Sequence, residues 1–339
     1  MLFNSLEFVI FFPCVITLYF AINERYKKIW LLLASYIFYM SWNPKFALLL
    51  AFATVITFFL GLYLDKKKRS KITMTVILII VFSALVYFKY SNFLISQINH
   101  VINIFHFQLI SHFDIVLPVG ISFFTFQAAG YLIDIYKKET KAERNFIKYA
   151  LFISFFPQLV AGPIERSKDL LNQFDNTKNY RPNRVFHGLL IMLWGFFLKI
   201  VIADRCALIA DYTFANYEHL KGIQLIAGAT AFSFQIYCDF MGYSTIARGA
   251  AKILGINLTE NFRMPYFSSS IKEFWRRWHI SLSYWLRDYL YIPLGGSRKG
   301  KLITYRNILL TFLISGLWHG AGWNYICWGG NTRFFYNNQ

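Results

Sequence analysis

Two histidines, each preceded by a tryptophan, are the residues of this chain best suited to acid–base chemistry. His279 lies in the charged and aromatic stretch FWRRWHISLSYWLRDYL, and His319 lies in the apolar stretch LLTFLISGLWHGAGW. An imidazole titrates near neutral pH and can accept a proton from a hydroxyl group, which makes it a general base. An ionisable side chain in a membrane-depth segment is costly and usually has a function. We therefore expect Ile271 to Asn324 to be the functional core that the remaining chain positions.

His319 is predicted to be a buried, neutral general base. Asn307 to Trp318 reads as an apolar helix, and Gly316, Gly320 and Gly322 flank the histidine. Small residues allow a backbone or a ligand to approach closely. Burial disfavours the charged imidazolium, so the ring is expected to be neutral. The alternative is a structural histidine that is hydrogen-bonded to a neighbouring helix.

The stretch from Ile271 to Leu290 predicts one amphipathic helix lying in the headgroup interface. At 100° per residue, tryptophans and leucines share one face, and lysine and arginine share the opposite face. His279 falls at the border between them, and a helix that serves only as an anchor is the alternative. The apolar face consists of Ile271, Trp275, Trp278, Leu282, Leu286 and Tyr289, and the polar face of Lys272, Arg276, Ser283 and Arg287.

The turn from Pro293 to Gly300 contains glycines with Arg298 and Lys299, which are residues that could surround a phosphate. It lacks both the spacing of a P-loop and a preceding strand, so a cytoplasmic loop is the favoured interpretation. The sequence contains no GxSxG elbow, no neighbouring cysteine and histidine, and no paired carboxylates in an apolar setting. Direct transfer by one base therefore fits better than a covalent intermediate. Asp239 ends an apolar run and is a candidate to orient a base or bind a cation.

The composition predicts a polytopic membrane protein. Apolar residues make up 56% of the 339 residues and charged residues only 15%, which is too little polar surface for a soluble globule. The net charge of +18 is divided among short clusters between apolar runs, so it indicates cytoplasmic loops and no nucleic-acid partner. Four single cysteines show no paired spacing, and neither a metal site nor a disulfide framework is expected.

Alternating apolar runs and basic loops predict the topology. With the basic loops near residues 25, 66 and 140 in the cytoplasm, the N-terminus and the 91–114 loop lie outside. The three histidines of that loop are spaced by six residues, which suits solvated side chains better than metal ligands. Residues 149–164 contain Pro157 and Pro163 and are expected to re-enter on the same face. The expected spans are Phe8–Ile22, which has no basic region before it and is expected to be retained, Ile29–Trp42, Phe46–Leu64, Ile72–Phe88, Val185–Ile202 and Ile223–Phe240.

Several motifs together resemble the membrane-bound O-acyltransferase family, in the branch that contains the membrane subunit of alginate O-acetylation. The stretch FWRRWHISLS, continued by WLRDYLYIPLGG, is similar to one family signature, and GLWHGAGW is similar to the signature that carries the family's histidine. PVGISFF, PQLVAGPI and NFRMPY support the resemblance, which covers residues 1–329. The fold it implies is an all-α polytopic membrane protein with a helical ring around a central tunnel and with re-entrant and interfacial helices.

The resemblance also implies an activity. His319 would be the catalytic base and His279 the second catalytic histidine, and no bound cofactor or metal is implied. The donor would be a cytoplasmic thioester, acetyl-CoA in this branch. The acetyl group would cross the bacterial cytoplasmic membrane to an extracellular or periplasmic acetyltransferase partner that modifies an exopolysaccharide or cell-wall glycan. The positions implied to contact substrate are Trp278, Arg276, Asp288, Trp318, Asn324 and Asp239.

Two other functions remain open, and one part of the sequence departs from the family. A sister branch transfers D-alanine to teichoic acid from a carrier protein, and a subunit that transports an acyl or glycolipid group without chemistry would not need His319.

Residues 1–329 are predicted to form one domain. The family pattern would continue after Gly329 with further spans, whereas residues 330–339 form a polar tail, so a chain lacking its C-terminal spans is expected.

Overall fold

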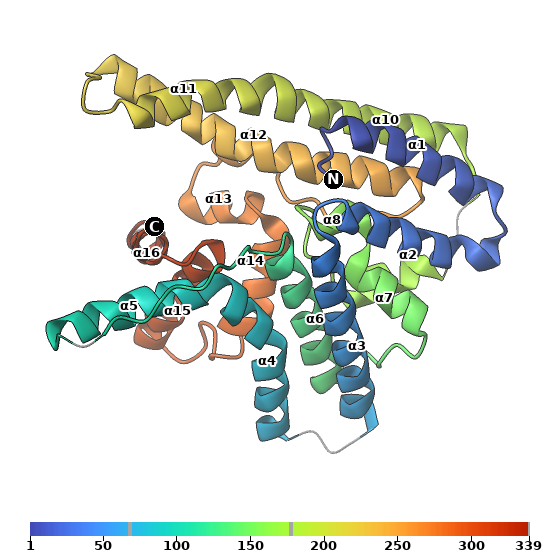
Figure 1. The fold of residues 1–339 in the computed structure, drawn as a ribbon, viewed down its shortest axis with the longest axis horizontal. Coiled ribbons are helices and arrows are strands. Elements are labelled where there is room, and N and C mark those ends of the chain that lie inside the picture. Colours follow the sequence, from blue (N-terminus) through green and yellow to red (C-terminus); the bar gives the residue numbers. More distant parts are fainter. Residues whose placement is uncertain (67–69, 107, 176–178, 338–339) are drawn as a thin grey trace. The chain divides into compact units, whose positions relative to one another are not determined.

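The computed structural model describes residues 1–66, 70–106, 108–175 and 179–337, with side chains as far as Gly330. Every regular element in this part of the chain is a helix (Figure 1). Three helical segments are long and apolar enough to cross a membrane, Pro44–Lys66, Lys71–Ile104 and Pro182–Ala215, and Leu6–Ala21 is a shorter apolar helix. The prediction of an all-helical, multi-pass membrane protein is confirmed.

The chain folds into two compact units, each built from two separate stretches. Unit 1 consists of Met1–Ala51 and Asn145–Phe262, and unit 2 consists of Phe52–Arg144 and Arg263–Gln339. The ring around a central tunnel and the single domain over residues 1–329 stay predictions. The expected polar tail begins within the last helix, whose backbone is helical to Asn337, and its side chains lie outside the described residues.

Unit 1 is organised by two long antiparallel helical segments that approach closely. Gly195 faces Gly242 across this interface, where an added β-carbon at Gly195 would lie 2.8 Å from the Gly242 carbonyl oxygen. Small residues at such a crossing let two backbones pack without side chains between them. The helices of unit 1 are α1 (Leu6–Ala21), α2 (Glu24–Met40), the start of α3 (Pro44–Lys66), α7 (Phe146–Ser154), α8 (Phe156–Leu159), α9 (Ser167–Leu170), η2 (Leu171–Phe174), α10 (Pro182–Phe196), η3 (Phe197–Ala203), α11 (Asp204–Ala215) and α12 (Ile223–Ile253).

Unit 2 contains both candidate histidines. Its long α15 packs against α16, and the chain changes direction between α4 and α5 (Figure 1). The helices of unit 2 are the rest of α3, α4 (Lys71–Leu85), η1 (Val86–Tyr90), α5 (Ser91–Ile104), α6 (Ile121–Tyr136), η4 (Pro265–Phe267), α13 (Ile271–Arg277), α14 (Ile280–Leu286), η5 (Arg287–Tyr291), α15 (Lys301–His319) and α16 (Trp323–Asn337).

Several expected boundaries were wrong and one break was correct. The run expected to end at Ile202 continues through η3 and α11 to Ala215. Residues 91–104 were expected in a loop, but they form α5, which continues α4 through η1. The run expected to end at Phe240 continues as α12 to Ile253, because small residues extend its contact with α10. The predicted interruption of residues 149–164 is present, since α7 ends at Ser154 and the four-residue α8 follows. Its re-entrant placement in a membrane stays a prediction.

Candidate active site

The predicted amphipathic helix of residues 271–290 is broken at His279. The α13 helix ends at Arg277, α14 starts at Ile280, and His279 between them has φ +42° in the left-handed region. A residue with a β-carbon is uncommon there, and such backbones often mark functional sites. The prediction of one continuous helix was therefore wrong, because helical periodicity does not indicate where a backbone turns. The turn redirects the chain and lets both short helices face one cavity.

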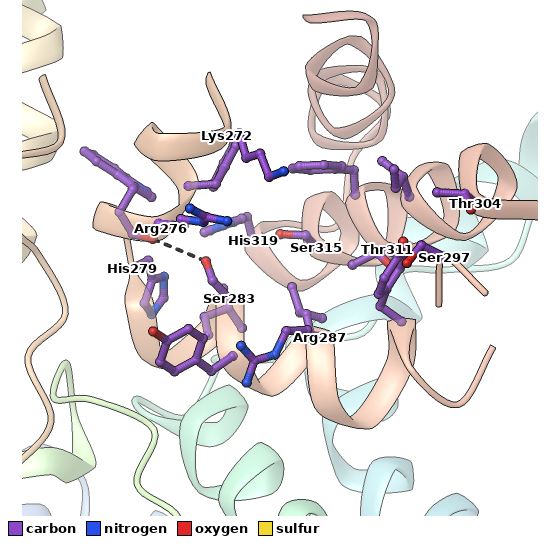
Figure 2. Close-up of a pocket in the computed structure, with 18 residues that line it drawn as sticks. Lys272, Arg276, His279, Ser283, Arg287, Ser297, Thr304, Thr311, Ser315 and His319 are labelled. Carbon is purple, nitrogen blue, oxygen red and sulfur yellow. Dashed lines mark hydrogen bonds between the residues drawn. The ribbon is translucent and has the colours of Figure 1, made fainter. Parts of the chain in front are cut away.

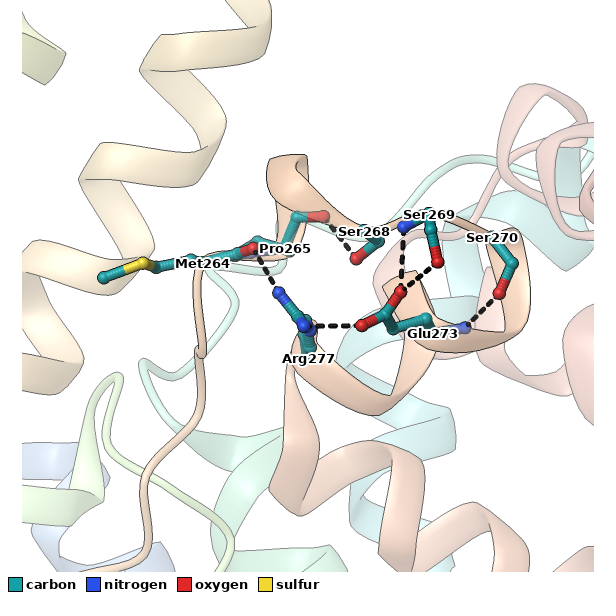
Figure 3. Close-up of polar contacts among 7 residues, drawn as sticks. All are labelled: Met264, Pro265, Ser268, Ser269, Ser270, Glu273 and Arg277. Atoms are coloured by element: carbon teal, nitrogen blue, oxygen red, sulfur yellow. Dashed lines mark hydrogen bonds and ion pairs between the residues drawn. The ribbon is translucent and has the colours of Figure 1, made fainter.

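Polar contacts at the start of α13 fix its direction (Figure 3). The Ser270 hydroxyl accepts a hydrogen bond from the Glu273 amide at 3.1 Å, and the Glu273 carboxylate accepts from the amide and hydroxyl of Ser269 at 2.8 and 2.7 Å. These donors lower the pKa of Glu273. Arg277 donates to the same carboxylate at 2.5 Å and to the Met264 carbonyl at 3.5 Å. Together the contacts resemble a helix capping box and hold α13 against the preceding loop.

The next two short helices are fixed on α6. Trp285 donates its indole N–H to the Phe126 carbonyl at 2.9 Å, and the two rings stack with centroids 4.0 Å apart. Tyr289 donates its hydroxyl to the Asp134 carboxylate at 2.7 Å. Gly130 lies between these contacts, where an added β-carbon would be 3.2 Å from the Trp285 indole nitrogen. Aromatic packing therefore determines where α14 and η5 lie.

The helix α15 is held at both ends. Near its start, the fully buried Asn307 donates to the carbonyls of Leu294 and Gly296 at 3.3 and 3.0 Å, which fixes the turn predicted between residues 293 and 300. Near its end, an added β-carbon at Gly316 would lie 2.2 Å from the Tyr325 carbonyl oxygen on α16. The glycines near His319 were expected to allow close approach of either a backbone or a ligand. At Gly316 the approaching group is the backbone of α16.

His279 and His319 border one cavity of about 530 Å³ in unit 2 (Figure 2). Their ring centroids are 6.5 Å apart, and the buried Trp318 ring lies 5.7 Å from His279 and 4.9 Å from His319. His279 is only 2% exposed. Burial, followed by the neighbouring His319 ring, lowers the pKa of His279 well below its ordinary value. His319 is exposed at the cavity and not enclosed as expected, but partial desolvation, followed by the Lys89 ammonium, lowers its pKa and keeps the ring neutral as predicted.

Positive side chains and hydroxyl groups line the rest of the cavity. Lys272 and Arg276 come from α13, and Arg287 comes from η5. In the described part of unit 2, the lining contains no carboxylate, so it suits an anionic ligand. Ser283 also lines it and donates its hydroxyl to the Trp278 carbonyl at 3.2 Å (Figure 2). Further hydroxyls come from Ser297, Thr304, Thr311 and Ser315.

The structure brings some of the predicted substrate positions to this cavity. Trp278 and Arg276 line it, and Trp318 packs against both histidines. Asp288 is not part of the lining, and its carboxylate pairs at 2.6 Å with the guanidinium of Arg287, which does line the cavity. Asn324 is exposed at the start of α16 and is also not part of the lining.

Lys272 and Arg287 line the cavity but were not assigned as site residues from the sequence. Both residues belong to the predicted polar face of residues 271–290, and that shared face could have indicated them as site residues.

Asp239 lies on α12 in unit 1. Its carboxylate pairs with the Lys199 ammonium at 2.6 Å, and Asp204 pairs with the same ammonium at 2.7 Å. Lys199 belongs to the apolar segment Pro182–Ala215, where an unpaired charge would be costly. The contact that the structure gives Asp239 is therefore an ion-pair cluster.

The histidines expected in an outer loop are exposed, as predicted for solvated side chains. His100 lies on α5, and His106 and His112 follow that helix. His112 is within hydrogen-bond distance of the Ser96 hydroxyl at 2.9 Å. Across the described residues, no group of three His, Cys, Asp or Glu side chains could hold a metal ion.

Comparisons with known proteins agree on one family. A model of MBOAT, the membrane-bound O-acyltransferase family, matches residues 139–336. The chain is 43% identical over 334 residues to the probable alginate O-acetylase AlgI of Pseudomonas aeruginosa, covering 97% of this chain and 64% of that protein. It is 39% identical over 367 residues to the peptidoglycan O-acetyltransferase of Helicobacter pylori, covering 97% and 68%. The teichoic acid D-alanyltransferase of Bacillus subtilis is 31% identical over 225 residues, covering 64% and 57%.

Proposed function

This chain belongs to the membrane-bound O-acyltransferase family, and we propose that it transfers an acetyl group from a cytoplasmic thioester for O-acetylation of an exopolysaccharide or cell-wall glycan. The observation that carries the proposal is the pair of histidines on one cavity lined by cations. Relatives with 97% coverage of this chain are named as acetylases of alginate or peptidoglycan. The chain spans slightly less than two thirds of the Pseudomonas aeruginosa relative.

The proposed step is a direct acyl transfer with His319 as the base. The imidazole accepts the proton of an acceptor hydroxyl, and the resulting oxygen nucleophile attacks the thioester carbonyl carbon. The new C–O bond forms as the C–S bond breaks, and the departing thiolate takes up the proton. The products are an O-acetyl ester and a free thiol. The exposure of His319 at the cavity supports this role, because substrate must reach the base.

The buried His279 is proposed to act as the second catalytic histidine, facing the reacting group in its neutral form. Its neighbour Trp278 and the cation Arg276 line the cavity beside it. Lys272 adds positive charge, which suits the phosphate groups of acetyl-CoA, whereas the charge of Arg287 is balanced by its ion pair with Asp288. A cavity of about 530 Å³ is within the size range of small-molecule sites. We infer that the donor enters from the cytoplasmic side of the cell membrane, through the part of the cavity that Lys272 and Arg276 line.

The acceptor is proposed to lie outside the cell membrane. The names of the relatives support two glycans, alginate and peptidoglycan, and an extracellular or periplasmic acetyltransferase partner would carry the acetyl group to the polymer. Transfer of D-alanine to teichoic acid is the second candidate, because the Bacillus subtilis relative is named as a teichoic acid D-alanyltransferase.

The test is polymer acetylation in a deletion strain that is complemented with this chain, its His319→Ala variant, or a His219→Ala control. His219 is an exposed histidine of unit 1 between α11 and α12, so its loss should leave acetylation unchanged. Loss of a general base should lower the rate about 10²-fold or more. A fourth strain carries this chain extended by the C-terminal part of a full-length relative, which measures whether the 339 residues suffice.

Each outcome separates one function from another. Acetylation that is lost only in the His319→Ala strain supports the proposed base. Acetylation at the parental level in that strain contradicts it and favours transport without chemistry. Radioactive D-alanine in the polymer, in place of acetate, would establish the carrier-protein donor. If only the extended chain restores acetylation, the activity belongs to the longer protein.

A further inference from the structure

Lys89 is a charged residue inside one of the three apolar segments, and it has a defined task there. It belongs to η1, the π-helical turn at the bend between α4 and α5 (Figure 1). A lysine in such a segment is costly unless its ammonium is paired. Short π-helical turns inside longer helices are frequent at functional sites. Lys89 directly follows the predicted span Ile72–Phe88, so neither periodicity nor hydropathy marks it as a site residue.

The partner of Lys89 is the residue directly before His319. Its ammonium donates a hydrogen bond to the Trp318 carbonyl and another to the Ser122 hydroxyl at 3.4 Å. The ammonium also lies 5.7 Å from the centroid of the Trp318 ring, within the range of a cation–π contact. The adjacent Tyr90 donates its hydroxyl to the Leu317 carbonyl at 2.6 Å. Two neighbouring residues of one π-turn thus bind two neighbouring carbonyls of α15.

These two carbonyls need external donors. The last four C=O groups of an α-helix have no partner within the helix, and α15 ends at His319. The N–H group of Gly320 donates to the Gly316 carbonyl. The carbonyls of the next residues, Leu317 and Trp318, therefore need donors from outside the helix. Tyr90 and Lys89 supply donors to the next two. A positive charge at a helix C-terminus is also favoured by the helix dipole.

We propose that Lys89 is a positioning residue that caps the last turn of α15 and so holds the His319 ring at the cavity. The proposal rests on the function proposed above for His319. Without the cap, the final turn would lose a charged hydrogen bond directly before the base. A displacement of about 1 Å at a reacting group can cost about 10²-fold in rate. A variant without this cap should still bind the thioester donor, because the cations Lys272 and Arg276 of the cavity belong to α13.

The experiment compares Lys89→Met, which keeps the length of the side chain but has no donor, with Lys89→Arg, which keeps charge and donor. In membranes of the complemented strain, we expect Lys89→Met to lower kcat for acetyl transfer 10- to 100-fold. The KM for acetyl-CoA should stay within about threefold, and Lys89→Arg should recover most of kcat. A Lys89→Met variant with parental kcat, or one whose loss is entirely in KM, overturns the proposal.

A second readout does not depend on activity. Hydrogen–deuterium exchange of the peptide covering residues 313–323 should be faster in Lys89→Met than in the parent and close to the parent in Lys89→Arg. Exchange in α12 of unit 1 serves as the folding control and should be unchanged. A loss of kcat with parental exchange in residues 313–323 contradicts the cap. Full activity of His319→Ala refutes the proposed function, and the exchange data then still decide whether Lys89 holds this turn.

Discussion

Replacing Gly316 with alanine should separate close packing of two helices from helix propensity, and Gly330 provides the matched control. An added β-carbon at Gly316 would lie 2.2 Å from the Tyr325 carbonyl oxygen and 3.1 Å from its carbonyl carbon. Ordinary non-bonded contacts are about 3.5 Å or longer, so α16 must move by about 1 Å. At Gly330 the nearest atom, Cδ2 of Leu313, is 3.8 Å away, and no movement is needed.

The magnitude follows from the difference between the two variants. Both replace a glycine inside a helix, and each gains up to about 1 kcal/mol of helix propensity. Only Gly316→Ala forces two backbones apart, which costs about 1–3 kcal/mol and can cost more. We therefore expect Gly330→Ala to be as stable as the parent or more stable, and Gly316→Ala to be less stable than Gly330→Ala by about that amount.

The assay is thermal unfolding of the protein purified in detergent, together with polymer acetylation in the complemented strain. Because α16 packs against the turn that carries His319, a shift of about 1 Å should lower acetylation by up to about 10²-fold in Gly316→Ala. Gly330→Ala should acetylate at the parental rate. Equal stability and equal activity of the two variants would refute the packing of α15 on α16.

Two further predictions concern buried polar groups. Burial raises the pKa of Glu165 to about 7, although the amide and hydroxyl of Thr259 donate to its carboxylate. A carboxyl with a raised folded-state pKa stabilises the fold at low pH, so stability should fall by about 3 kcal/mol as the pH rises from about 4.5 to 7, and thermal unfolding across that range should show no such decrease in Glu165→Gln. Replacing the fully buried Asn307 with alanine should lower the free energy of unfolding by about 1–3 kcal/mol, because its two carbonyl partners lose a donor. Hydrogen–deuterium exchange in residues 293–300 should then be faster than in a control variant with alanine at the exposed Thr75. A parental exchange rate in Asn307→Ala would contradict the second prediction.

The membrane class and most helices could be predicted because they depend on local sequence. The apolar run after Pro44 and the one after Pro182 became helical segments suited to a membrane, as their length and hydropathy indicate. The interruption near Pro157 was also predicted, because proline and glycine act on the backbone locally. The family resemblance implied catalytic roles for His279 and His319, but only the structure places both on one cavity, because residue spacing alone does not bring together two side chains that are forty positions apart.

The features that were missed depend on tertiary contacts. His279 adopts a left-handed backbone because α13 and α14 pack in different directions, and no periodicity records that. The exposure of His319 depends on an open cavity, which a hydropathy profile cannot show. The pairing of Asp239 with Lys199 connects α12 with η3, and the capping by Lys89 connects η1 with α15. Each contact joins segments that are distant in the sequence.

The discontinuous composition of unit 1 has a consequence for the order of folding during synthesis. Its first stretch ends at Ala51, and its second stretch is complete only at Phe262. At about 5–20 residues per second, roughly 10–40 s pass between these two points on the ribosome. In the first part of that interval, until Phe156 is synthesised, α1 and α2 lack the ring that packs against Phe11 and Phe38. We expect lipid or the insertion machinery to cover this helical pair until the later helices arrive.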